Sequence, residues 1–251
     1  LEAKLYWVKK VGVRHSLIAK SIGFLLLCHL SINSALSKNI DNQFSSNQLE
    51  LILNQKKYSL LKELFLEESF KQFNKKYLDF RKNYKDITWS INTKSNNLKT
   101  KILEIKIKSK RKIGAQVYNL NSLQTVEIKT FNKKIKSYKV INEQSILSSN
   151  GSPLVIKIIS PEKVLTGERY EFNLIVEKPL DNSLIASGII VLKNTEGINI
   201  SNDQFGIQPN QSGGLFKYIQ APLEPGFQTI SAIITHPDGI YSLTKKIKVG
   251  L

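Results

Sequence analysis

The chain has 251 residues, with 37 Lys and Arg against 20 Asp and Glu, three His and one Cys. A chain of this length forms one large domain or two small ones, each able to bury a core. Because Cys28 is the only cysteine and histidines are few, the composition argues against a zinc site, a thiol nucleophile or a disulfide framework. We therefore predict no catalytic residue, no cofactor and no metal.

The net charge of +17 is unevenly distributed along the chain. Residues 38–150 carry 23 basic and 10 acidic side chains, whereas residues 151–251 carry nine of each. All seven Pro and ten of the 13 Gly also lie beyond residue 150. Two composition changes at the same point predict a domain boundary, with residues 149–153 as the linker.

Residues 1–37 have the order of a secretory signal peptide. Five basic residues precede an apolar run over residues 21–32, and a short stretch of small and polar residues follows. The apolar run is shorter than the roughly 20 residues that span a bilayer. The pattern predicts export to the periplasm or the thylakoid lumen, with cleavage before Lys38 and a flexible segment over residues 38–46. The alternatives are an uncleaved signal that holds the protein at the membrane and a buried helix.

Helices are predicted in the first part of residues 47–148. Leu49, Ile52 and Leu53 are spaced for one helical face, and a second apolar group of the same kind spans residues 60–65. A third segment places five aromatic side chains at helical spacing, and such a stripe is typical of a core. The stripe consists of Phe70, Phe73, Tyr77, Phe80 and Tyr84.

Strands are predicted next, because the apolar period changes to two. Alternating segments occur at residues 87–91, 103–107, 123–131 and 135–146. Asn132-Lys133-Lys134 between the last two is a hairpin turn. Helices followed by a meander of antiparallel strands predict an α+β cone, in which a curved sheet wraps over the helices.

The order of these segments, together with Gln116-Val-Tyr118, Gln124-Thr-Val-Glu-Ile128 and Lys134-Ile135, resembles the nuclear-transport-factor-2-like (SnoaL-like, cystatin-like cone) superfamily over residues 47–148. The resemblance implies either an enzyme with an acid–base pair inside the cone or a non-enzymatic binding module. It also implies that two copies of the chain can form a homodimer through the sheet of the cone domain.

The residues of this segment favour a binding module over an enzyme. There is no His, Asp79 and Asp86 lie next to the turn from helix to strand, and Glu104 and Glu127 lie among lysines. Tyr118 fits a buried structural role better than a catalytic one. The sequence therefore departs from the catalytic pattern of the superfamily.

One strand of the predicted sheet is strongly basic. Lys106, Lys108 and Lys110 alternate with Ile105 and Ile107, so the lysines share one face. This face is either a solvated surface that discourages edge pairing or a surface that binds an anionic partner. Nucleic acid is disfavoured, because stacking aromatics and Arg are lacking; an anionic membrane surface or an acidic protein fits better. The candidate residues for an anionic partner are Lys99, Lys101, Lys106, Lys108, Lys110, Arg111 and Lys112.

Residues 154–250 have the pattern of an all-β module. Roughly seven short strands are separated by turn signals, as in a β-sandwich. The closing segment, from Pro225-Gly226 through Pro237-Asp238-Gly239 to Val249, resembles the last hairpin of bacterial immunoglobulin-like domains. His236 precedes this turn and is expected to face solvent. The resemblance implies a module that binds or spaces.

The order of signal, cone and sandwich resembles uncharacterised exported proteins of cyanobacteria. The predicted fold class is an α+β cone followed by an all-β immunoglobulin-like sandwich. The predicted function is a non-catalytic exported binding or assembly protein of the envelope or thylakoid lumen, whose basic sheet face contacts an anionic or protein partner. The alternatives are a small-molecule enzyme or carrier that uses the cone-domain cavity, and a structural spacer anchored by an uncleaved signal helix.

Overall fold

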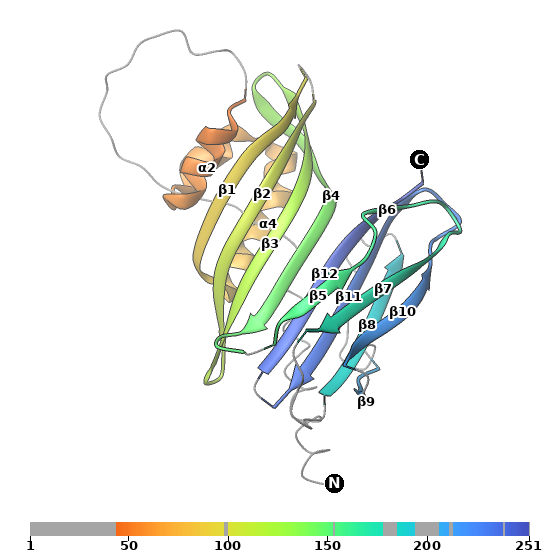
Figure 1. Cartoon of the computed structure of the whole chain (residues 1–251). Coiled ribbons are helices and arrows are strands. Elements are labelled where there is room, and N and C mark those ends of the chain that lie inside the picture. Colours follow the sequence, from red (N-terminus) through yellow and green to blue (C-terminus); the bar gives the residue numbers. More distant parts are fainter. Residues whose placement is uncertain are drawn as a thin grey trace. The chain divides into compact units, whose positions relative to one another are not determined.

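The computed structural model describes residues 44–97, 100–152, 154–177, 185–193, 206–210, 213–237 and 239–250 (Figure 1). Strands hold 62% of these residues, and the three helices among them all precede the first strand. The predicted signal peptide and its cleavage site lie outside the described residues, as does Lys99.

The chain divides into two compact units. The helix-bearing unit is the described part of Gly23–Lys110 and Asn121–Val140, and the all-β unit is the described part of Arg111–Leu120 and Ile141–Leu251. Three strands have residues in both units: β2 (Thr100–Ile113), β3 (Gln116–Phe131) and β4 (Lys134–Ser149). The division therefore falls within strands.

The helix-bearing unit contains α2 (Ser46–Asn54), α3 (Tyr58–Leu64) and α4 (Glu67–Asn83). Ser45 is the N-cap of α2, and its hydroxyl accepts a hydrogen bond from the backbone N–H of Gln48. α2 buries the three residues that the sequence pattern predicts, Leu49, Ile52 and Leu53. In α4, acidic residues in the first turn and basic residues in the last turn complement the helix dipole.

The buried face of α4 is largely aromatic. The predicted stripe is confirmed, because Phe70, Phe73, Tyr77, Phe80 and the following Tyr84 are all buried. Ring centroids lie 6.0 Å apart for Phe73 and Tyr77 and 4.6 Å apart for Phe80 and Tyr84. These separations are those of favourable aromatic pairs. Phe80 also meets Trp89 of β1 (Lys85–Asn96) at 6.2 Å, so aromatic rings fill the space between α4 and the sheet.

Side chains of α2 cover the edge of β1. The Asn54 side chain exchanges two hydrogen bonds of 2.9 Å with the backbone of Trp89. The backbone N–H of Ile91 donates to the Glu50 carboxylate at 2.6 Å. An edge strand otherwise presents unpaired backbone groups that template association with another strand. α2 therefore protects this edge as well as contributing to the core.

The first four strands follow one another in the sheet, in the order β1-β2-β3-β4. The predicted hairpin between β3 and β4 is confirmed, with Asn132 and Lys133 as its turn. Both turn residues have positive φ, 47° and 64°, which is the signature of a two-residue type I′ turn. The helices are tied to this hairpin, because the Ser69 hydroxyl and the Leu66 N–H both donate to the Ile135 carbonyl.

In the all-β unit the sheet continues from β4 into strands that are far away in sequence. Glu143–Ser148 of β4 lie antiparallel to Tyr241–Lys246 of β12. The order then runs through β11 and β8 to β9, and β6 pairs in parallel with β12. The bounds of these strands are β6 Lys163–Val164, β8 Ile185–Lys193, β9 Gln208–Asn210, β11 Gly226–His236 and β12 Gly239–Val249.

A second sheet of the all-β unit has the order β10-β7-β5. Its strands are β5 Ile156–Ile159, β7 Arg169–Val176 and β10 Gly214–Gln220. Phe172 and Leu174 of this sheet belong to the same buried cluster as Ile234 and Leu243 of the larger sheet. The cluster is mainly aliphatic. The two sheets of this unit thus share one core.

The predicted fold class, an α+β cone followed by an all-β immunoglobulin-like sandwich, is wrong. The described chain is mostly antiparallel β, with only three short helices and one large sheet. The prediction treated β4 and β12 as strands of separate sheets, but they are hydrogen-bonded neighbours. Pairing of two edges removes the exposed backbone groups of both, and such long-range pairing has no local sequence signal.

The predicted linker over residues 149–153 carries several hydrogen bonds. Ser149 is the last residue of β4, and its hydroxyl accepts the Ile240 N–H at 2.9 Å. The Asn150 N–H donates to the Val117 carbonyl at 2.8 Å. The division into domains at this segment stays a prediction.

His236 is buried, with 4% of its surface exposed, so the expectation of a solvent-facing histidine is wrong. It is the last residue of β11 and lies opposite Gly239. This hairpin end packs closely: a Cβ on Gly239 would stand 2.9 Å from both Ser149 and Ser152. Ser149 and Ser152, at and just after the end of β4, therefore lie close to the start of β12.

Candidate functional site

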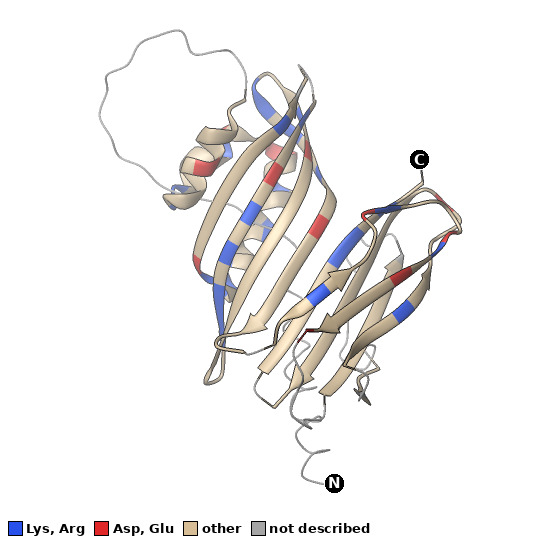
Figure 2. Ribbon diagram, viewed as in Figure 1, with Lys and Arg blue, Asp and Glu red and all other residues tan. Residues whose placement is uncertain are grey.

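β2 has two chemically different faces. Leu103, Ile105 and Ile107 are buried, whereas Lys106, Lys108 and Lys110 are exposed. Figure 2 shows several basic positions along β2. The strand alternation predicted from the sequence places the three lysines on one face, which we call the lysine face. All three residues belong to the helix-bearing unit.

The neighbouring strand leaves the lysine face uncovered. Ser90 of β1 lies opposite Lys106, and Thr88 lies opposite Lys108. Both are small, uncharged side chains. Among the described residues, no carboxylate forms an ion pair with Lys108 or Lys110. The positive charge at these two positions is therefore directed to solvent.

Glu104 partly neutralises one end of the lysine face. Its carboxylate lies 2.6 Å from the Lys94 ammonium and 3.6 Å from that of Lys106. The hydrogen bond from Lys94 is the main cause that lowers the pKa of Glu104. Sequence reasoning did not select Lys94, although its place on β1 could have been read from the alternation that begins at Ile87.

The remaining predicted site residues have different positions. Lys112 is exposed like the three lysines of the lysine face, but Lys101 and Arg111 are buried. The Lys101 ammonium donates to the Phe44 carbonyl at 2.7 Å and lies 5.6 Å from the centre of its ring. Lys101 therefore anchors the chain before α2. The structure brings Lys106, Lys108 and Lys110 together and turns Lys101 and Arg111 to the opposite face.

The carboxylates considered for catalysis are dispersed. Glu127 forms an ion pair with Lys129 at 3.7 Å, and Asp79 is exposed on α4. Tyr118 is buried, and its hydroxyl donates to the Gln116 side chain at 2.8 Å. A proton-transfer site needs such groups held together in a dry pocket. These contacts give Glu127 and Tyr118 local structural roles.

Two features that are absent from the described residues bear on the kind of site. No described helix has the length and apolar character needed to cross a membrane. Within the same part of the chain, no three His, Cys, Asp or Glu side chains gather as metal ligands would.

The comparison with protein families matches only the C-terminal part of the chain. Residues 151–250 match a family described as a domain of unknown function (DUF8623). The lysine face lies outside the matched residues. A search of curated proteins found no relative. The resemblances to the nuclear-transport-factor-2-like and immunoglobulin-like families stay predictions.

Proposed function

We propose that this protein is a non-catalytic binding protein that acts after export, in the periplasm or thylakoid lumen. The lysine face is its contact surface for an anionic partner. The observation that carries the proposal is the exposure of Lys106, Lys108 and Lys110 on one face of β2, where the uncharged Ser90 and Thr88 of β1 lie opposite Lys106 and Lys108.

The spacing of the lysines supports joint action. Alternate side chains on a strand are about 6.5–7 Å apart along a face. This distance is shorter than the Debye length of about 8 Å at physiological ionic strength, so the potentials of neighbouring lysines add. Near an anionic bilayer each lysine contributes on the order of 1 kcal/mol, and three together give measurable association.

The chemistry of the face favours a diffuse anionic surface. Lys is a hydrated point charge and lacks the planar fork with which Arg binds a shaped site. The one aromatic residue of β1 and β2 is Trp89, which is buried, so no ring of these strands offers a platform for bases. A bilayer with anionic lipids fits these properties best, and an acidic protein surface is the other candidate.

The enzyme or carrier alternative finds less support. It depends on a cavity between helices and sheet that is large enough for a substrate, which takes about 300–1,000 Å³. In the helix-bearing unit this space holds the rings of Phe73, Tyr77 and Phe80, and each of these side chains is at most 4% exposed.

The proposal is tested with the triple variant Lys106→Glu/Lys108→Glu/Lys110→Glu. Binding is measured by co-sedimentation with phosphatidylcholine vesicles that do or do not contain phosphatidylglycerol, at low and high salt. We expect the wild type to sediment only with anionic vesicles at low salt, and the variant to remain in solution.

A matched control carries the same charge change on α4, at the exposed Lys75, Lys76 and Lys82. We expect this control to keep at least half of the wild-type binding. Pull-down from an extract at both salt concentrations tests the acidic protein as partner. If wild type and triple variant retain the same vesicles and proteins at every salt concentration, the lysine face is only a solvated surface.

Export has a separate test. Mass spectrometry of the protein from its native cells should find an N-terminus close to Lys38. An intact N-terminal segment on a cytosolic protein contradicts this part of the proposal.

A further inference from the structure

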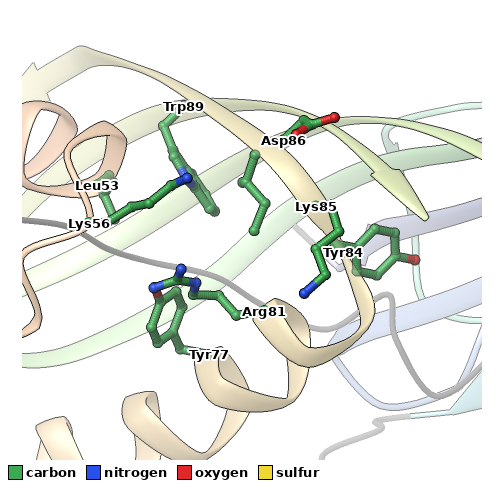
Figure 3. A pocket seen from close by; sticks show the side chains of 9 residues that line it. Leu53, Lys56, Tyr77, Arg81, Tyr84, Lys85, Asp86 and Trp89 are labelled. Atoms are coloured by element: carbon green, nitrogen blue, oxygen red, sulfur yellow. The ribbon is translucent and has the colours of Figure 1, made fainter. Parts of the chain in front are cut away.

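A small pocket of the helix-bearing unit lies where α4 leads into β1 (Figure 3). Its cavity volume is about 70 Å³. Its walls come from the end of α2, the last turns of α4 and the start of β1. The lining residues are Leu53, Lys56, Tyr77, Arg81, Tyr84, Lys85, Asp86, Ile87 and Trp89.

Three cationic side chains line this pocket from three different elements. Lys56 follows α2, Arg81 belongs to α4 and Lys85 begins β1. Figure 3 shows them extending toward the same opening, whereas the carboxylate of Asp86 points away from it. Within the described part of the chain, none of the three cations forms an ion pair. The pocket therefore concentrates positive charge.

Arg81 is held in place by a buried neighbour. Its guanidinium donates to the Tyr77 hydroxyl at 3.0 Å and lies 5.8 Å from the centre of the Tyr77 ring. Tyr77 is 1% exposed and packs against Phe73. A fixed guanidinium loses less conformational entropy on binding a ligand than a free side chain does.

The backbone around the pocket is irregular at two positions and in its strand register. Lys56 and Asp86 have φ of 61° and 51°, in the left-handed region that non-glycine residues rarely adopt. The register between β1 and β2 also shifts between Lys85 and Thr88, as at a β-bulge. Bulges redirect side chains and cluster next to functional sites, as do strained backbone positions. Here the shift follows Lys85. Lys85 lies opposite Lys110 in the sheet, and it also lines the pocket.

The end of α4 opposes an anion in this position, because helix C-termini carry partial negative charge. The opposition is limited, since the Phe80 carbonyl in the last turn already accepts the Tyr84 N–H at 2.9 Å. The helix end corresponds to roughly half of one negative charge, whereas three full positive charges surround the opening. The balance favours an anionic ligand.

We propose that this pocket binds a phosphate group. Its volume corresponds to roughly two water molecules, enough for one tetrahedral oxyanion but far below the size of a nucleotide site. Arg81 supplies directed donors to two phosphate oxygens, and Lys56 and Lys85 supply charge. The phosphate belongs either to a free ion or to the headgroup of a lipid.

Titration calorimetry of the mature chain with inorganic phosphate, at constant ionic strength in chloride, tests the proposal. We expect saturable one-site binding. Arg81→Gln should weaken it about tenfold or more, because a charge-assisted pair is lost. Lys85→Gln should weaken it by a smaller factor, and this exposed position keeps the test valid if Arg81→Gln fails to fold. Lys82→Gln, on the same helix but outside the lining, is the matched control.

Vesicles that contain phosphatidic acid in phosphatidylcholine distinguish the two sources of phosphate. A lipid ligand predicts that Arg81→Gln lowers vesicle binding at a salt concentration where the lysine face no longer acts. A free ion predicts unchanged vesicle binding and loss of phosphate titration only. Absence of saturable binding to both probes, or equal binding by wild type and Arg81→Gln, overturns the proposal. Lys106→Glu/Lys108→Glu changes the lysine face but spares Lys110, which lies opposite the pocket residue Lys85, so it should keep phosphate binding and the two proposals fail separately.

Discussion

The two units build their interiors from different side chains. In the helix-bearing unit, rings such as Phe65 and Phe73, 4.7 Å apart, fill the space between helices and sheet. In the all-β unit, mostly Ile, Leu, Val and Ala lie between two sheets. A helix packed on a sheet leaves a deep space that large rings fill, whereas facing sheets about 10 Å apart suit branched aliphatic chains. The exterior differs as well, because the excess of lysine precedes residue 151.

This contrast shows where charge is tolerated. Residues 151–251, which supply most of the aliphatic core, have equal numbers of acidic and basic residues, and residues 38–150, which supply the aromatic core, carry a net positive charge. The exposed lysines of β2 do not disturb the core, because the residues that alternate with them are the ones that face the core. The net charge therefore belongs mainly to one part of the chain, and predictions can be directed at each unit separately.

The largest expected effect is on the two cores. Phe73→Ala and Phe172→Ala remove fully buried rings, one from each unit, and each should lower the free energy of unfolding by about 3–5 kcal/mol. Trp89 lies in the helix-bearing unit and is the one Trp after residue 37, so its fluorescence reports that unit. Because β2, β3 and β4 have residues in both units, we expect both variants to shift the Trp89 transition in urea. A Trp89 transition that is unmoved by Phe172→Ala contradicts this coupling and favours independent domains.

A smaller effect is expected from two buried lysines. Lys57 in the helix-bearing unit is 2% exposed, and among the described residues its ammonium has no hydrogen-bond partner. Lys245 in the all-β unit donates to the Ser160 carbonyl at 3.3 Å and is near Glu162. Burial lowers the pKa of Lys245 as well, but its hydrogen bond and the nearby Glu162 offset part of the cost of its charge. Lys57→Met should therefore stabilise the protein more than Lys245→Met does. Midpoints of urea unfolding measure both.

The pH dependence of the stability gives a second test of Lys57. Burial lowers the pKa of Lys57, so the unfolded chain binds its proton more tightly than the folded chain does. The stability of the wild type should rise as the pH increases from neutral toward the ordinary lysine pKa near 10.5, and Lys57→Met should lose this part of the rise. Equal pH profiles for both proteins, together with no gain in stability, contradict the assignment.

A third effect is confined to the all-β unit and has the opposite sign at high pH. Burial raises the pKa of Tyr241 to about 12, and it also raises the pKa of Tyr170. Above pH 10 the unfolded chain releases these protons first, so stability falls by up to about 1.4 kcal/mol per pH unit for each group. Tyr241→Phe should reduce this fall between pH 10 and 12. The hydrogen bond to Glu171 also raises the pKa of Tyr218, but this residue is exposed, so Tyr218→Phe should reduce the fall less. Unfolding in urea at several pH values checks the difference.

Local patterns predicted the elements that depend on neighbouring residues. The aromatic stripe of α4, the alternation of β2 and the turn at Asn132 and Lys133 all follow from spacing and turn chemistry within a few residues. The pairing of β4 with β12 joins segments about a hundred residues apart, and nothing local specifies it. The fold class failed at this point. The expectation for His236 was also wrong, because this residue is buried.

The candidate site was predicted in part for the same reason. Parity along β2 places Lys106, Lys108 and Lys110 outward, and the same parity would have placed Lys101 and Arg111 inward with Ile105. The predicted site included Lys101 and Arg111 because they are close to the other lysines in sequence. Whether each position is odd or even along the strand was not taken into account, so these two buried residues were added. The phosphate pocket had no sequence signal, because it depends on a register shift and on the left-handed conformation of Lys56 and Asp86.

The last prediction combines the smallest expected change in stability with a change in vesicle binding. The change in binding rests on the proposed function. Glu104→Gln removes the carboxylate that is paired with Lys106 and Lys94, and it leaves the lysine face one charge more positive. Stability should change little, because both lysine partners are exposed and ion pairs with exposed partners contribute little.

Binding to phosphatidylglycerol vesicles should tighten roughly fivefold for Glu104→Gln, since one charge near an anionic surface is worth on the order of 1 kcal/mol. Glu67→Gln is the matched control, because it makes the same charge change at an exposed ion pair with Lys71 on α4. Co-sedimentation at low salt compares the two variants. A gain that is equal in both indicates an effect of net charge alone, and only a larger gain for Glu104→Gln places the contact on the lysine face.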